Sequence, residues 1–148
     1  AVGSASAPVP ADDWSGGGTV LVVDDEESIR SVAARMLNRL GFQVIEAGDG
    51  AAAVDILRAS PTPLTAALLD LTMPGLSGEE TLRQLRRIDK RLPVILMSGY
   101  NQSEVLDRFV GRDLAGFLQK PFKLDDLRDK LRELFQESAG SGTTPRAS

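Results

Sequence analysis

The apolar residues of this chain follow two alternating patterns. Short continuous apolar runs occupy positions such as 19–23, 64–69 and 93–97, a pattern typical of strands that are buried on both faces. Between these runs, apolar residues recur at spacings of three and four, as they do over positions 29–40, which predicts amphipathic helices. The pattern therefore predicts a regular alternation of strands and helices.

Five strand–helix units follow one another in this way. The predicted strands occupy positions 19–23, 42–46, 64–69, 93–97 and 114–118. The predicted helices run over positions 29–40 and 49–59, from 77 through 85, from about 103 to 110, and from 124 to 135. Alternation of this kind implies an α/β fold with a parallel sheet that helices cover on both faces.

Turn and capping residues support several of these boundaries. Gly41 is expected to end the first helix, and Asp49 is expected to cap the second. Ser77, with Glu80 three residues later, predicts a capping box at the start of the third helix. The two ends of the chain are rich in small and turn-forming residues, so we expect a flexible linker over positions 1–18, one domain over 19–137, and a disordered tail over 138–148.

Polar residues of chemical interest lie at the carboxyl ends of four of the five predicted strands. Asp24 and Asp25 follow the first strand, Asp70 the third, Ser98 the fourth and Lys120 the fifth. Taken singly, each has a structural explanation as a helix cap or a turn residue. In a parallel sheet, however, all these ends lie at one edge, where open α/β proteins bind their ligands. The sequence therefore predicts a functional site at that edge.

These residue types point to metal-assisted phosphoryl transfer. Three carboxylates in one pocket repel one another, and a divalent cation removes that penalty. A ligand set of oxygens alone favours a hard ion, of which Mg2+ fits best, and Mn2+ is the substitute we consider. A lysine and a hydroxyl group are the parts needed to hold phosphoryl oxygens during in-line transfer, and a carboxylate beside the ion can act as the nucleophile.

Composition excludes several other functions. The chain has 148 residues, of which 42% are hydrophobic, and a formal net charge of -4, so direct binding of nucleic acid is not expected. It contains neither cysteine nor histidine, which excludes disulfides, thiolate chemistry and histidine as a phosphate carrier within this chain. The sequence shows no bilayer-spanning apolar run and no signal peptide, so we expect a cytoplasmic domain without membrane contact of its own.

Together these features resemble the receiver domain of response regulators in two-component signalling. The resemblance covers positions 19–137 and rests on motifs that occur in the family's order: Val22-Val23-Asp24-Asp25, Leu69-Asp70-Leu71-Thr72-Met73-Pro74-Gly75, Ser98-Gly99, Phe117, and Lys120-Pro121-Phe122. It implies a flavodoxin-like fold with strand order 2-1-3-4-5. It also implies a module that catalyses its own phosphorylation and dephosphorylation and switches conformation, rather than a classical enzyme.

The resemblance assigns a role to each residue of the site. Asp70 would be the phosphoacceptor. Asp25, Asp70 and the backbone carbonyl of Thr72 would bind Mg2+ directly, and Asp24 would act through a bound water. Lys120 would pair with Asp70 at rest and with the phosphoryl group after transfer.

Further residues would carry the response. Ser98 would hydrogen-bond a phosphoryl oxygen, and Phe117, at the family's aromatic switch position, would turn inward as Ser98 moves. Thr72 and Tyr100 would tune the lifetime of the phosphoryl group. The Lys120–Pro121 peptide bond would be cis, an arrangement open mainly to proline.

Two alternative functions compete with this interpretation. A phosphatase of the haloacid-dehalogenase type needs a second acid two residues after its nucleophile, where this chain has Thr72. A pseudo-receiver, acting only through protein contacts, usually lacks an acid or the lysine, and neither is missing here. Because the chain has no histidine, the phosphoryl donor must be a separate histidine kinase or histidine phosphotransfer domain.

The context of the domain has two interpretations. It is either a single-domain regulator or the C-terminal receiver of a hybrid sensor histidine kinase, where it would belong to the cytoplasmic part of a membrane-bound protein. The glycine-rich linker and the first residue, which is not Met, favour the hybrid kinase.

Overall fold

The computed structural model describes residues 16–60, 63–71, 78–99 and 116–143. The strands are β1 (Thr19–Val23), β2 (Gln43–Ala47), β3 (Ala66–Asp70), β4 (Val94–Ser98) and β5 (Gly116–Gln119). The helices within the described residues are α1 (Glu27–Arg39), α2 (Gly50–Ala59), α3 (Gly78–Ile88) and α5 (Leu124–Thr143). The predicted helix near position 103 and the predicted cap Ser77 lie outside the described residues.

All five strands are parallel and lie in the order β2-β1-β3-β4-β5. This order confirms the predicted flavodoxin-like fold. The register pairs Val23 with Leu69 across β1 and β3, and Asp70 with Met97 across β3 and β4. The strands therefore end at one common edge of the sheet, so the residues that follow them are brought together.

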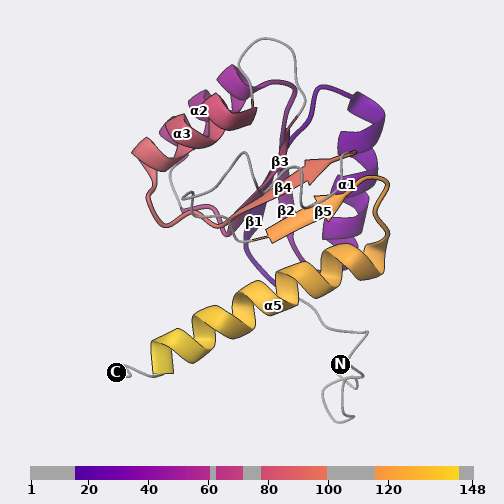
Figure 1. Cartoon of the computed structure of the whole chain (residues 1–148), viewed down its shortest axis with the longest axis vertical. Helices are drawn as coiled ribbons and strands as arrows, with labels where there is room; N and C mark the ends of the chain where they lie inside the picture. The colour runs from indigo at the N-terminus through magenta and orange to yellow at the C-terminus, as the bar shows by residue number, and fades with distance from the viewer. Residues whose placement is uncertain (1–15, 61–62, 72–77, 100–115, 144–148) are drawn as a thin grey trace.

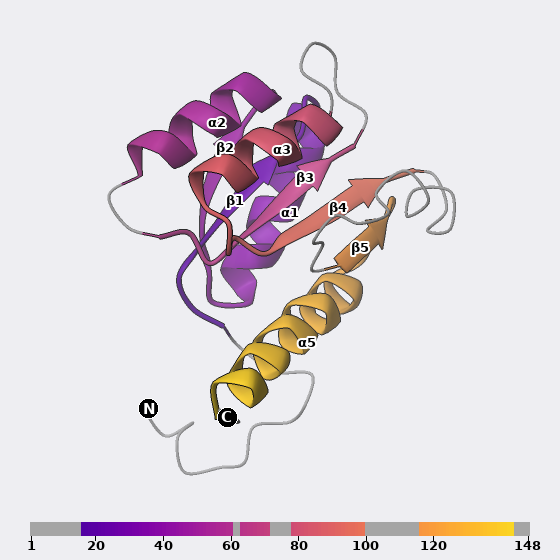
Figure 2. The same cartoon turned by 60° about the vertical axis from the view of Figure 1, so that its left-hand side comes forward.

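Helices cover both faces of the sheet (Figures 1 and 2), with α2 and α3 on one face and α1 and α5 on the other. Successive residues of a strand pack alternately into the core on one face of the sheet and the core on the other. Leu21 and Leu69 belong to the core on the side of α2 and α3, whereas Val22 and Leu68 belong to the core on the side of α1 and α5. This double burial explains why the strands are continuous apolar runs rather than alternating ones.

The predicted end of α1 and the predicted cap of α2 are confirmed. Gly41 has a φ of 98°, a left-handed conformation that favours glycine. Its N–H donates to the carbonyl of Asn38 at 3.1 Å, and the Phe42 N–H donates to the carbonyl of Leu37 at 2.9 Å, the bond pattern of a Schellman motif. The Asp49 side chain accepts a hydrogen bond of 2.8 Å from the N–H of Ala52 at the start of α2.

Some boundaries differ from the predicted ones by a few residues. β3 and β4 extend to include Asp70 and Ser98, because the backbone of these polar residues continues the ladder of hydrogen bonds. The helix α5 continues to Thr143, beyond the boundary at 137, since each further helical residue adds one hydrogen bond. The domain boundaries themselves remain a prediction.

The N-terminal side of the domain is tied to α1. The Gly16 N–H donates a hydrogen bond of 2.6 Å to the carbonyl of Leu40, so the last residues of the predicted linker contact the domain.

Over the described part of the chain, none of the helices has both the length and the apolar character that crossing a membrane requires.

Candidate functional site

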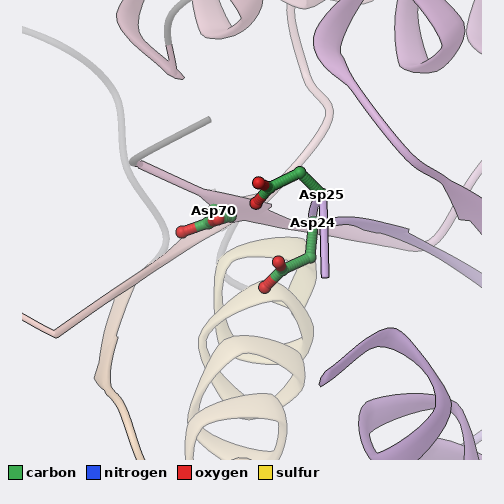
Figure 3. A group of neighbouring side chains, drawn as sticks. All are labelled: Asp24, Asp25 and Asp70. Carbon is green, nitrogen blue, oxygen red and sulfur yellow. The ribbon is translucent and has the colours of Figure 1, made fainter. Parts of the chain in front are cut away.

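Three carboxylates meet at the carboxyl end of the sheet (Figure 3). Asp70 is the last residue of β3 and Asp24 directly follows β1, and both are buried, whereas Asp25 is exposed. One carboxylate oxygen of each residue lies within 4.8 Å of the other two. The structure thus brings together the three acids that the sequence predicted to converge.

Asp24 is fixed by both its backbone and its side chain. Its N–H donates to the carbonyl of Ala47 at 3.1 Å, which holds the end of β1 against β2. Its Oδ1 accepts a hydrogen bond of 2.9 Å from the N–H of Glu26 at the start of α1. Asp24 therefore has a structural role at the start of α1 and also lies in the acidic site, the cluster of Asp24, Asp25 and Asp70; its part in metal binding remains a prediction.

Lys120 joins two of the acids. Its Nζ lies 2.7 Å from Oδ2 of Asp24 and 3.2 Å from Oδ1 of Asp70. Its backbone N–H donates to the carbonyl of Ser98 at 2.7 Å, which fixes the end of β5 beside β4. The expected ion pair with Asp70 and the expected cis Lys120–Pro121 peptide bond are both present. The closer contact with Asp24 was not predicted.

The charge of Lys120 is stabilised by these contacts. Burial disfavours the charged ammonium group and by itself lowers its pKa. The hydrogen bond to Asp24 and the negative charges of Asp70 and Asp24 act in the opposite direction and outweigh burial. The pKa of Lys120 therefore lies above its ordinary value, and the side chain brings a positive charge to the acidic site at neutral pH.

The remaining predicted residues are placed as follows. Ser98 is fully buried at the end of β4, at the same edge as Asp70. Phe117 of β5 is buried in the core on the side of α2 and α3. Thr72 and Tyr100 lie outside the described residues, so their predicted roles remain predictions.

Sequence reasoning missed two residues beside the site. Arg30 of α1 donates from Nη1 to the backbone carbonyl of Asp24 at 2.7 Å, and from Nε to Oε1 of Glu46 in β2 at 3.3 Å. Arg30 lies in the first half of α1 beside the half-buried Ile29, and the sequence pattern does not single it out. Nothing in the pattern of Glu46 distinguishes it from other exposed strand residues.

The donor set fits a small hard cation. Mg2+ binds oxygens at about 2.0–2.1 Å, so two oxygens on one ion lie at most about 4.2 Å apart. The carboxylate oxygens of the acidic site, which lie within 4.8 Å of one another, need only small side-chain movements to reach that spacing. An all-oxygen site of this kind suits Mg2+ better than the softer transition metals.

Comparison with known proteins identifies the family. Residues 20–132 match the sequence profile of the response regulator receiver domain. The chain belongs to this family. It is therefore a receiver domain of two-component signalling, which leaves the haloacid-dehalogenase alternative without support.

Two known proteins are similar to this chain in sequence. The chain is 31% identical over 114 residues to sporulation initiation phosphotransferase F of Bacillus subtilis (strain 168), covering 77% of this chain and 90% of that protein. It is 32% identical over 127 residues to sensor kinase CckA of Brucella abortus (strain 2308), covering 86% of this chain but only 13% of that protein.

A solved structure is similar over most of the chain. It is the receiver domain of a sensor histidine kinase from Pseudomonas aeruginosa PAO1, with a magnesium ion coordinated in its active-site cleft. The TM-score is 0.71 at 26% identity, and the match covers 80% of this chain and 98% of that one.

Proposed function

We propose that this receiver domain accepts a phosphoryl group from a phosphohistidine onto Asp70. The observation that carries the proposal is the surrounding of the Asp70 carboxylate, which has a lysine ammonium 3.2 Å from Oδ1 and two further acids within metal-sharing distance. A carboxylate oxygen of Asp70 attacks phosphorus, and an O–P bond forms as the N–P bond to the donor imidazole breaks. The electron pair of that bond returns to the imidazole nitrogen.

Asp25 and Asp70 would hold Mg2+ directly with the carbonyl of Thr72, while Asp24 would act through a bound water. This division agrees with the contacts of Asp24, whose two carboxylate oxygens already accept from Glu26 and Lys120. When bound, the ion neutralises charge on the transferring phosphoryl oxygens. Mn2+ is the substitute that the same oxygen donors would accept.

Lys120 offsets the negative charges of Asp24 and Asp70 before phosphorylation and binds a phosphoryl oxygen afterwards. After the transfer, Ser98 moves so that its hydroxyl group donates to another phosphoryl oxygen. Phe117, as the switch residue, changes its position as Ser98 moves. Such a response is a shift between two existing states that the phosphoryl group favours unequally. Thr72 and Tyr100 set the lifetime of the aspartyl phosphate by controlling the access of water.

The donor is a histidine kinase or a histidine phosphotransfer domain, and it docks beside Lys120. An apolar groove of about 330 Å3 is lined by Ile29, Val32, Lys120, Pro121 and Phe122. Val32 is 44% exposed, an unusual exposure for a large apolar side chain. Because Lys120 both lines this groove and contacts Asp70, an apolar helix of the donor seated there would bring its phosphohistidine to the acceptor.

Incubation with acetyl phosphate tests this proposal without the natural donor. Mass spectrometry of the intact protein should show a phosphate adduct on the wild type that requires Mg2+ and is absent from Asp70→Asn. Asp49→Asn, which changes a helix cap outside the site, is the matched control and should be labelled like the wild type. An adduct that persists on Asp70→Asn would refute the assignment.

A further inference from the structure

We propose that Arg30 is a positioning residue of the metal site, which acts by fixing the peptide between Asp24 and Asp25. The inference rests on the proposed function, because it concerns the same Mg2+ site. The Nη1 of Arg30 donates to the backbone carbonyl of Asp24 at 2.7 Å, and its Nε donates to Glu46, which is not one of the three acids of the site. Its effect on the metal must therefore pass through the backbone.

The peptide plane carries that effect to Asp25. The carbonyl of Asp24 and the N–H of Asp25 belong to one rigid planar unit. A charge-assisted hydrogen bond to that carbonyl therefore fixes the orientation of the plane, and with it the direction in which the Asp25 side chain leaves the backbone. Figure 3 shows that Asp24 and Asp25 leave the end of β1 in different directions, so this orientation decides which side chain reaches the ion.

Asp24 itself has other anchors. Its N–H is held by Ala47 at 3.1 Å, and its carboxylate is held by Glu26 at 2.9 Å and by Lys120 at 2.7 Å. Loss of Arg30 therefore leaves the Asp24 side chain in place. The loss of Arg30 instead frees the peptide between Asp24 and Asp25. The residue affected is Asp25, which is exposed and lies beyond Val23, the last residue of β1 that pairs with β2.

The guanidinium group suits this task because its rigid fork of donors binds two partners at once. Its Nε lies 3.3 Å from Oε1 of Glu46 while Nη1 holds the carbonyl of Asp24. One side chain thereby links α1, β2 and the end of β1. A lysine offers a compact charge but lacks this fixed fork, so Arg30→Lys separates the effect of charge from that of geometry.

Calorimetric titration of the whole chain with MgCl2 tests the proposal. Arg30→Met keeps an unbranched apolar stem and removes the charged fork, and we expect it to weaken Mg2+ binding about tenfold, the lower end of what residues behind metal ligands contribute. Arg30→Lys should restore only part of the affinity. Arg58→Met is the matched control, because Arg58 is an exposed arginine on α2 whose partner is Asp55, and it should bind Mg2+ as the wild type does.

The Mg2+ dependence of labelling by acetyl phosphate gives a second readout. For Arg30→Met, the Mg2+ concentration that gives half the maximal rate should rise by about the same factor of ten, while the rate at saturating Mg2+ stays within about twofold of the wild type. A purely structural role would leave the half-saturating concentration unchanged among the folded molecules.

Each outcome separates the two proposals. If Arg30→Met, or Arg30→Lys where the former does not fold, binds Mg2+ as tightly as the wild type, the positioning role is refuted and the proposed function stands. Full recovery of affinity in Arg30→Lys would also refute it, because charge alone would then suffice. If the wild type itself binds no Mg2+ and Asp70 is not labelled, both proposals fail.

Discussion

The ammonium group of Lys120 lies 2.7 Å from Oδ2 of Asp24, closer than the 3.2 Å that separate it from Oδ1 of Asp70. The side chain of Asp24 is fully buried and that of Lys120 is only 16% exposed. Breaking such a pair leaves an uncompensated charge in a desolvated place. This ion pair is therefore a structural element of the resting domain in addition to any role in phosphoryl transfer.

Lys120→Met should lower the free energy of unfolding by about 2–3 kcal/mol in the absence of Mg2+. This is somewhat less than the loss expected when one partner of a fully buried ion pair is removed. Urea unfolding followed by circular dichroism measures this free energy. Adding Asp24→Asn to Lys120→Met should recover part of the loss, because it removes the charge left without its partner. Lys90→Met, at an exposed position, is the control, and equal stabilities of Lys120→Met and the control would contradict the argument.

Gly78→Ala should destabilise the domain although alanine favours helices. A Cβ at position 78 would lie 2.9 Å from both the Cα and the carbonyl oxygen of Leu71, so the start of α3 must move away from the end of β3. We expect a loss of about 1–3 kcal/mol in the free energy of unfolding, typical of overpacking. Gly17→Ala is the control, because no atom lies within 4 Å of its added Cβ. A gain in stability for Gly78→Ala would contradict the expected overpacking.

Most of the fold could be predicted because the signals are local. The run of apolar residues in β1 (Thr19–Val23) and the glycine that ends α1 need no knowledge of distant parts of the chain. Convergence of Asp24 and Asp70 followed from topology alone, since parallel strands end at one edge.

The missed contacts depend on packing between distant segments. The Lys120–Asp24 hydrogen bond joins residues 96 positions apart. The spacing of residues in the sequence does not indicate which of several nearby acids pairs with a lysine. The link from Arg30 to Glu46 joins α1 to β2, and the close approach of Gly78 to Leu71 depends on where α3 packs on the sheet, which local sequence patterns do not reveal.

Asp25→Asn should abolish the stabilisation that Mg2+ confers. A ligand at ten times its dissociation constant stabilises the folded state by about 1.4 kcal/mol, which thermal unfolding with and without MgCl2 detects in the wild type. Asp25 is exposed, so its replacement should leave the stability without Mg2+ nearly unchanged or slightly higher. The neighbouring Glu26→Gln should respond to Mg2+ like the wild type, and an equal response of Asp25→Asn would exclude Asp25 as a ligand.

Val32→Asp should slow transfer from a phosphorylated histidine phosphotransfer protein more than tenfold, because it places a charge in the apolar groove that we propose for the donor. Labelling by acetyl phosphate, which needs no docking, should continue at the rate of the wild type. Ala51→Asp adds the same charge on α2, on the other face of the sheet, where it should not affect either reaction. Equal slowing of both reactions by Val32→Asp would argue against a docking groove.

The position of the phosphoryl group tests the central claim most directly. Borohydride reduces an aspartyl phosphate to homoserine, and tandem mass spectrometry of the digested protein locates that residue after labelling with acetyl phosphate and Mg2+. We predict homoserine at position 70 and unchanged aspartate at positions 24 and 25. Homoserine at position 24 or 25, or none at position 70 in a protein that carries the phosphate adduct, would contradict the account.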